Sequence, residues 1–358
     1  MKVLYDYQVL LFQRYGGISR YYYEIYNRIR SMGEDTSIHC LFNKNAYFES
    51  ELNCHYKEEY SKIPFKSLIN KLYTINDVWR QKYDIIHPTY YDPYIIGKHK
   101  GKLVVTVHDM IHEKYYGVDV DARTIKNKKK MIYAADQIIV VSENTKQDLL
   151  SYYPDIKEEN IAVVYHGSSF KPHKFNKANE DFPSKYILFV GNRGEYKNYN
   201  RFFKAIEPIL ADMDDLYLVS IGGGLFNDEE RIMHKSVKEK VIHMDADDMT
   251  LSYAYSNALC FVFPSLYEGF GIPVLEAFSC GCPVVLSNTS SLPEVGGNAV
   301  VYIDPYNIEN IEHEVRNLIG DEEKMMKMVE KGKKQLKKFN WDLAAEQTLE
   351  CYRRVLGN

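Results

Sequence analysis

Two glutamates flank a short glycine-containing segment in the second half of the chain, Glu268 at its start and Glu276 eight positions later (276 − 268). Gly269 and Gly271 lie between them and allow positive φ angles, which let a backbone approach a ligand closely. Pro273 suits the first turn of a helix, where its missing N–H costs nothing. The amides at the start of that helix would therefore form an anion site with a carboxylate on each side.

The elements that must position these residues are a buried strand and a short helix. The apolar run at residues 259–263 is rich in β-formers and closed by Pro264, so it predicts a fully buried strand. The helix is expected over residues 273–279 and ends at Gly281. The amides of Phe270, Gly271 and Ile272 then face outward between the two elements, and two carboxylates beside them indicate recognition of hydroxyl groups.

The segment from Phe263 to Ala277, continuing through Gly281 to Glu294, resembles the donor-binding signature of the retaining, nucleotide-sugar-dependent glycosyltransferases of family 4. The resemblance implies an α/β protein of the GT-B fold, with two doubly wound Rossmann-like domains facing across a cleft. It implies that Glu276 binds the ribose hydroxyls and that Glu268 binds the sugar.

The first half opens with a strand, a glycine pair and a helix, an arrangement that lets backbone approach a phosphate or a sugar. The strand is expected at Lys2–Asp6, the pair is Gly16 and Gly17, and the helix is expected over residues 18–30. A turn without a ligand fits the pattern equally well. The family resemblance favours the ligand-binding interpretation and implies that the glycine pair lies against the diphosphate of the donor.

Strands and helices alternate through the rest of this half, which predicts a parallel sheet covered by helices on both faces. Ligands of such sheets bind at the carboxyl ends of the strands. The strands are expected at residues 37–42, 84–86, 103–107, 137–141 and 161–165, and the helices at 126–135 and 143–153.

Two strand ends carry candidate residues. His108 follows the strand at 103–107, and Ser142 follows the strand at 137–141 as an expected N-cap. A zinc pair of His108 and His112 is rejected, because i,i+4 spacing needs a helix and no third ligand of clear spacing is near. The family resemblance implies that His108 contacts the transferred sugar or the phosphate, and Asp109 is a weaker candidate.

A basic run at Lys126, Lys128, Lys129 and Lys130 opens a predicted helix. Such a run is usually a solvated helix face, although it could also contact acidic lipid or an acceptor phosphate.

A linker is expected at residues 167–183, where periodicity is lost, and a second sheet starts after it. Its first strand leads into a loop that holds Gly191, Arg193 and Lys197. Two cations in such a loop can offset the charge of a diphosphate, whereas exposed loop cations without a ligand are the alternative. The resemblance fits Lys197 well, while Arg193 lies one or two places from the usual family spacing.

Asp-x-Asp occurs at Asp119/Asp121, Asp212/Asp214 and Asp245/Asp247, which indicates turns and helix caps in an acidic chain. We therefore predict no metal and a metal-independent enzyme. By resemblance, Met244 presents its backbone to the base of the nucleotide, and the turn at residues 222–224 lies close to the nucleotide.

The composition fits a globular protein of about two domains, with 358 residues, 45% hydrophobic residues and a net charge of −4. No nucleic-acid partner is implied, and neither an 18-residue apolar run nor a signal peptide is visible, so the cytoplasm is the expected location. The six cysteines are expected as free buried thiols. The expected domains are 1–169 with 341–358, which would bind the acceptor, and 170–340, which would bind the nucleotide sugar.

The resemblance implies transfer of a hexose with retention of configuration to a glycan or lipid-linked glycan, in surface polysaccharide synthesis. The N-terminal run and the second half resemble the mannosyltransferases of the family most, which makes GDP-mannose the preferred donor and a UDP-sugar the alternative, with no other cofactor. A lipid-linked acceptor would make the protein peripheral to the inner membrane face. Two other classes stay open: a sugar-nucleotide epimerase of the same fold, and a non-catalytic nucleotide-binding partner subunit.

Overall fold

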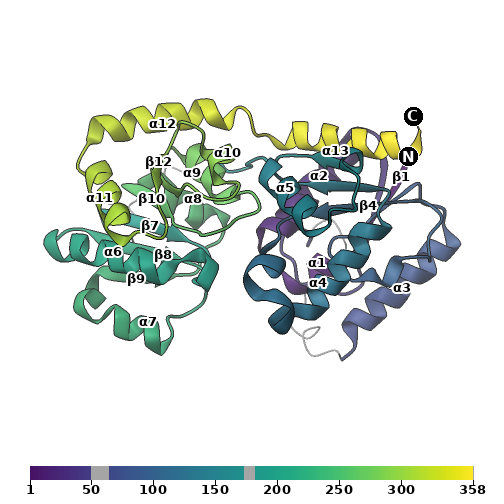
Figure 1. The fold of residues 1–358 in the computed structure, drawn as a ribbon, viewed down its shortest axis with the longest axis horizontal. Helices are drawn as coiled ribbons and strands as arrows, with labels where there is room; N and C mark the ends of the chain where they lie inside the picture. Colours follow the sequence, from purple (N-terminus) through teal and green to yellow (C-terminus); the bar gives the residue numbers. More distant parts are fainter. Residues whose placement is uncertain (50–63, 173–181, 358) are drawn as a thin grey trace. The chain divides into compact units, whose positions relative to one another are not determined.

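The computed structural model describes residues 1–49, 64–172 and 182–357, and the chain divides into two compact units (Figure 1). Unit 1 comprises Met1–His166 and Trp341–Asn358, and unit 2 comprises Gly167–Asn340. The limits expected from the sequence were residues 169 and 340. The C-terminal segment thus belongs to the same unit as the N-terminus.

Unit 1 is built on a parallel sheet of six strands in the order β2-β1-β3-β4-β5-β6. All six strands were predicted, with ends that differ by one to three residues where they differ. Their bounds are β1 Lys2–Asp6, β2 Asp35–His39, β3 Ile85–His87, β4 Lys102–Val107, β5 Gln137–Val140 and β6 Ile161–Val163.

The main helices of unit 1 connect these strands, and α13 comes from the end of the chain (Figure 1). Two of them, α1 and α3, were not predicted, and α4 starts well before the expected residue 126. Their bounds are α1 Gln8–Phe12, α2 Gly17–Ser31, α3 Lys66–Arg80, α4 Gly117–Ala134, α5 Glu143–Tyr152 and α13 Trp341–Leu356.

Unit 2 repeats this plan with a parallel sheet of six strands in the order β12-β11-β10-β7-β8-β9. The strands are β7 Tyr186–Val190, β8 Tyr217–Ile221, β9 Val241–Met244, β10 Cys260–Phe263, β11 Val284–Ser287 and β12 Val301–Ile303. The main helices are α6 Tyr199–Asp212, α7 Asp228–Met233, α8 Asp248–Asn257, α9 Ile272–Cys280, α10 Leu292–Gly296, α11 Ile308–Ile319 and α12 Glu322–Leu336. The expected α/β class with two doubly wound Rossmann-like units is confirmed.

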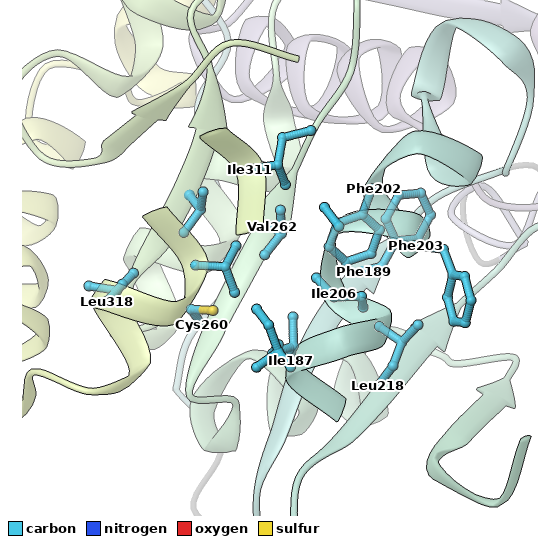
Figure 2. Packing of buried hydrophobic residues seen from close by; sticks show 14 of the residues in the cluster. Ile187, Phe189, Phe202, Phe203, Ile206, Leu218, Cys260, Val262, Ile311 and Leu318 are labelled. Carbon is cyan, nitrogen blue, oxygen red and sulfur yellow. The ribbon is translucent and has the colours of Figure 1, made fainter. Parts of the chain in front are cut away.

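The core of unit 2 lies between its sheet and helices α6 and α11 (Figure 2). Helix α6 turns Phe202 and Ile206, spaced by one helical turn, onto the strands. The ring of Phe202 stacks on Phe189 of β7 with 5.7 Å between ring centroids. This packing fixes β7 and β10, whose carboxyl ends carry the loops predicted to bind the donor.

The cysteines behave as predicted in the described part of the chain. Five of them, Cys40, Cys260, Cys280, Cys282 and Cys351, are buried free thiols. Cys54 lies outside the described residues.

Candidate functional site

The loop between β10 and α9 takes the conformation that its glycines predict. Gly271 is the N-cap of α9 with a φ of 116°, a left-handed angle that L side chains rarely adopt. A Cβ atom there would also come within 3.0 Å of Leu292 Cδ2. The first-turn amides of α9, including that of Ile272, can therefore point toward an anionic ligand.

Two serines that the sequence analysis missed hold this loop. The backbone N–H of Glu268 donates to Ser290 Oγ at 3.0 Å, and the hydroxyl of Ser291 lies 2.9 Å from the carbonyl oxygens of both Glu268 and Phe270. The Phe270 ring is buried and meets Phe339 edge-on, so this residue can offer a ligand only its backbone. Only the fold brings these serines to the loop.

Lys197 and Glu268, which were predicted for separate tasks, form an ion pair in the structure. Lys197 Nζ lies 2.6 Å from Glu268 Oε1, and the two side chains are only 14% and 12% exposed. The pair carries no net charge and is largely shielded from water. A bound diphosphate would therefore find an ammonium group that the glutamate already orients.

Arg193 is not part of the Lys197–Glu268 ion pair, because its side chain contacts another loop of unit 2. Its Nε donates to Glu230 at 2.6 Å, while its terminal nitrogens donate to the carbonyls of Gly222 at 2.7 Å and Gly224 at 2.8 Å. The side chain is 4% exposed. Its donors hold the glycine turn, so Arg193 positions this loop, and its contact with the diphosphate stays a prediction.

The glycine turn that Arg193 holds joins three strand ends. Gly222, Gly223 and Gly224 have φ angles of 86°, 78° and 71°, a run of left-handed residues that requires glycine. The N–H of Gly222 donates to the carbonyl of Met244 at 3.1 Å, and the N–H of Gly191 donates to Ile221 at 2.9 Å. The predicted residues Gly191 and Met244 thus lie at the same edge of the unit 2 sheet.

Glu276 lies on α9 and is 7% exposed. The Tyr255 hydroxyl of α8 donates to its Oε2 at 3.3 Å. Burial, followed by the nearby Glu276 charge, holds the pKa of Tyr255 well above its usual range, so the phenol keeps its proton for this bond.

The candidate residue of unit 1, His108, stands at the end of β4 with a neutral ring. It is 7% exposed, its backbone N–H donates to the Tyr91 hydroxyl at 3.2 Å, and its ring packs edge-on against Tyr21. Burial lowers the pKa of His108 to about 4. Its Nε2 atom is buried and has no hydrogen-bond partner among the described residues, so it can accept from or donate to a ligand hydroxyl.

The lysine run beside this histidine is not a uniformly solvated face. Lys128 is 0% exposed, and its Nζ contacts Glu113 Oε2 at 2.8 Å and the Asp109 carbonyl at 2.6 Å. The Asp109 carboxylate accepts the N–H of Ile111 at 3.0 Å. The expectation of a solvated side chain was therefore wrong for Lys128, because the fold brings it to Glu113, which lies 15 positions earlier in the chain. Asp109 shapes the turn after His108.

The glycine pair and the expected cap lie at helix starts of unit 1. Gly17 is the first residue of α2, and a Cβ at Gly16 would come within 2.6 Å of Gln13 Oε1. That same oxygen accepts the N–H of Ser19, so one amide of the helix start is already used by Gln13. Ser142 caps α5 as predicted, accepting the N–H of Thr145 at 3.0 Å.

A buried chain of hydrogen bonds, which no sequence pattern predicted, lies near His108. The hydroxyls of Tyr5 and Tyr352 are 2.8 Å apart, and His87 joins Tyr352 at 2.6 Å to Thr106 at 2.8 Å. The Tyr21 hydroxyl continues it to Thr106 at 3.1 Å. These hydrogen bonds fasten α13 to the sheet, and the three tyrosines are core residues whose hydroxyl groups find partners.

Acid should destabilise unit 1 through its buried histidines. Burial lowers the pKa of His108 to about 4 and that of His87 to about 3, whereas an unfolded histidine titrates near 6.5. The unfolded chain then binds more protons below pH ~6.5, so the free energy of unfolding falls as the pH drops from about 6.5 to about 4, by up to about 1.4 kcal/mol per pH unit for each histidine. Urea titrations followed by tryptophan fluorescence report on this unit, because Trp79 and Trp341 both belong to it. His108→Asn should show a shallower pH dependence, and an unchanged slope would contradict the assignment.

The structure offers no cluster for a metal ion within residues 1–49, 64–172 and 182–357: no group of three His, Cys, Asp or Glu side chains could hold one. Asp247 instead caps α8 by accepting the N–H of Thr250 at 2.8 Å. The side chain of Asp119 lies outside the described residues. None of the described helices is long and apolar enough to span a membrane.

Two family models match successive parts of the chain. The model described as "Glycosyltransferase Family 4" matches residues 15–169, and the model described as "Glycosyl transferases group 1" matches residues 170–335. The chain belongs to glycosyltransferase family 4. The predicted family is confirmed, and so is the enzyme class of glycosyltransferase.

Relatives of this family 4 chain include mannosyltransferases. It is 32% identical to O-antigen chain mannosyltransferase B of Escherichia coli over 173 residues, which are 47% of this chain and 45% of that protein. It is 26% identical to the serotype-specific mannosyltransferase WbdA of Escherichia coli over 275 residues, which are 71% of this chain and 34% of WbdA. The matches thus span less than half the length of these two proteins.

The family 4 chain shares its fold with solved structures of low identity. Sucrose-phosphate synthase from Thermosynechococcus elongatus superposes with a TM-score of 0.78 at 18% identity, over 99% of both chains. This confirms the GT-B fold.

Proposed function

We propose that this chain is a retaining hexosyltransferase that moves mannose from GDP-mannose to a glycan or lipid-linked glycan acceptor in surface polysaccharide synthesis. The observation that carries the proposal is the shielded ion pair between Lys197, which follows β7, and Glu268, which lies on the loop before α9. The start of α9 has no side-chain cap. The mannosyltransferase relatives support mannose as the sugar.

Cleavage of the C1–O bond builds positive charge on the sugar ring and negative charge on the leaving diphosphate. In the proposed mechanism, Lys197 and the amides of Phe270, Gly271 and Ile272 stabilise that negative charge. Glu268 orients Lys197 and binds a sugar hydroxyl, while Glu276 binds the ribose. The acceptor hydroxyl attacks the same face of the sugar, and the departing phosphate takes its proton.

Unit 1 would bind the acceptor and contribute His108. A neutral imidazole can exchange a hydrogen bond with a sugar hydroxyl without adding a charge to the site. Gly16 and Gly17 would lie against the diphosphate, and Ser142 would offer its backbone near the same ligand. With a lipid-linked acceptor the protein would work at the inner membrane face as a peripheral protein.

The test is incubation with GDP-mannose, UDP-glucose, UDP-N-acetylglucosamine and ADP-glucose, each with and without mannose oligosaccharide acceptors. Release of GDP that requires the acceptor, with an α-linked product by NMR, is the expected result. Conversion of a nucleotide sugar without an acceptor would indicate the epimerase instead. Binding of GDP without any turnover would indicate the non-catalytic subunit.

A further inference from the structure

We propose that helix α3 of unit 1 docks this chain onto an anionic phospholipid surface. The helix leaves large apolar side chains in solvent: Leu68 is 50% exposed, Leu72 57% and Trp79 71%. Phe65, which precedes the helix, is 76% exposed. Figure 1 shows α3 at the periphery of its unit.

The exposed apolar residues share one face of α3. At 100° per residue, Leu68, Leu72 and Trp79 fall within about 40° of one another, because they are spaced by one and by about two helical turns. Ile69 and Tyr73 widen this face and are 37% and 40% exposed. A contiguous apolar face of this kind on the surface of a protein is typical of an interaction site.

The buried face of the same helix is mixed, because two polar residues lie there beside Ile75 and Val78. The helix thus departs from the usual surface helix, whose large apolar residues face the core. Asn70 is 0% exposed, and its Oδ1 accepts the N–H groups of Leu41 at 2.7 Å and Phe42 at 3.1 Å. Thr74 is also 0% exposed and donates to the Asn70 carbonyl at 3.0 Å. Hydrogen bonds therefore fix α3 to its unit, while its leucines and tryptophan remain available for an apolar phase.

The charges around this face are complementary to anionic lipid. The acid of the helix, Asp77, is turned toward the Tyr83 hydroxyl and Gln81. Beside Trp79 lies a cavity of about 280 Å³ whose charged lining is basic, with Arg80, Lys82, Lys98 and Lys100, and no Asp or Glu is among its described lining residues. A phosphate headgroup fits this lining while the apolar face of α3 enters the acyl boundary.

A second copy of the chain is a weaker occupant of this surface. A two-fold dimer brings the same patch of both copies together, so the lysines around the cavity would face like charges. A bilayer supplies both the apolar layer and the negative phosphates, and tryptophan favours the boundary between them. The charge pattern therefore selects the membrane.

This inference deepens the proposed function, because a lipid-linked acceptor is held at such a surface. It can be tested apart from transfer activity. The binding experiment contains vesicles and no nucleotide sugar, whereas the transfer experiment contains oligosaccharide acceptors and no vesicles. Either proposal can fail while the other stands.

The experiment is flotation of the full chain with vesicles of phosphatidylcholine alone and of phosphatidylcholine with 30% phosphatidylglycerol, a composition chosen to carry about physiological charge. We expect binding to the anionic vesicles, with a blue shift of tryptophan emission and quenching by lipids brominated on their acyl chains. Trp79 is the reporter, because Trp341 is 1% exposed. Leu68→Gln/Leu72→Gln should weaken partitioning at least about tenfold, and Lys82→Gln/Lys100→Gln should weaken it by about fivefold per lysine.

Matched controls lie on an exposed surface of unit 2. Ile232→Gln replaces a side chain that is 73% exposed, and Lys235→Gln/Lys238→Gln removes two exposed lysines; neither should change binding. Equal circular dichroism and thermal midpoints would show that all variants fold. Equal binding of the wild type and the α3 variants would overturn the proposal. A wild-type dimer in solution that Leu68→Gln/Leu72→Gln dissociates would also overturn it, in favour of a contact between copies.

Discussion

Replacing Lys197 by alanine is expected to lower kcat by about 10²–10³-fold, the usual cost of losing one donor to a developing negative charge. Lys197 is the cation paired with Glu268 at 2.6 Å, and its 14% exposure limits the water that could replace it. The loss should appear in kcat more than in KM, because the charge on the diphosphate grows as the C1–O bond breaks. Steady-state kinetics with the donor identified by the panel provide the measurement.

The controls for Lys197→Ala must distinguish the loss of a positive charge at the site from a loss of protein stability. Lys197→Ala leaves Glu268 without its partner, so Lys197→Ala/Glu268→Gln should recover stability and not kcat. Lys204→Ala removes an exposed lysine of helix α6 and should leave kcat within about twofold, as expected for a surface substitution. Near-normal turnover of Lys197→Ala would remove this residue from the proposed mechanism.

Replacing Lys128 by methionine should lower the free energy of unfolding of unit 1 by about 3–5 kcal/mol. The Lys128 ammonium is 0% exposed and its partner Glu113 is 3% exposed, so the substitution leaves a buried carboxylate without its cation. It also removes the bond to the Asp109 carbonyl in the turn after His108. Urea unfolding followed by tryptophan fluorescence measures the loss.

The neighbouring Lys130 provides the matched control, since it is exposed on the same helix. Lys130→Met should change the free energy of unfolding by less than about 0.5 kcal/mol. Lys128→Met/Glu113→Leu, which removes both charges, should be more stable than Lys128→Met alone. If Lys128→Met unfolds like the wild type, the buried pair does not stabilise this unit.

Local patterns predicted most of the framework. The strands of unit 1, the buried strand before the glycine loop, and the caps at Ser142 and Asp247 depend on residues within a few positions of one another, whereas β12 was not predicted. Helix α3 escaped prediction because Asn70 and Thr74 share its buried face with Ile75 and Val78, while Leu68, Leu72 and Trp79 are exposed. Its apolar residues therefore do not form the single inward stripe that is typical of a surface helix.

The sequence by itself determined the family, the two sheets and most candidate residues, because strand, turn and cap signals are short-range and the donor-binding segment is continuous. Tertiary structure alone decided their partners. Lys197 and Glu268 are 71 positions apart, and Arg193 and Glu230 are 37 apart, so no local pattern pairs them. Both cations are largely buried, and a buried charge needs a partner. The partner that the fold supplies then determines whether the cation is available to bind a ligand, as proposed for Lys197, or holds a loop in place, as Arg193 does.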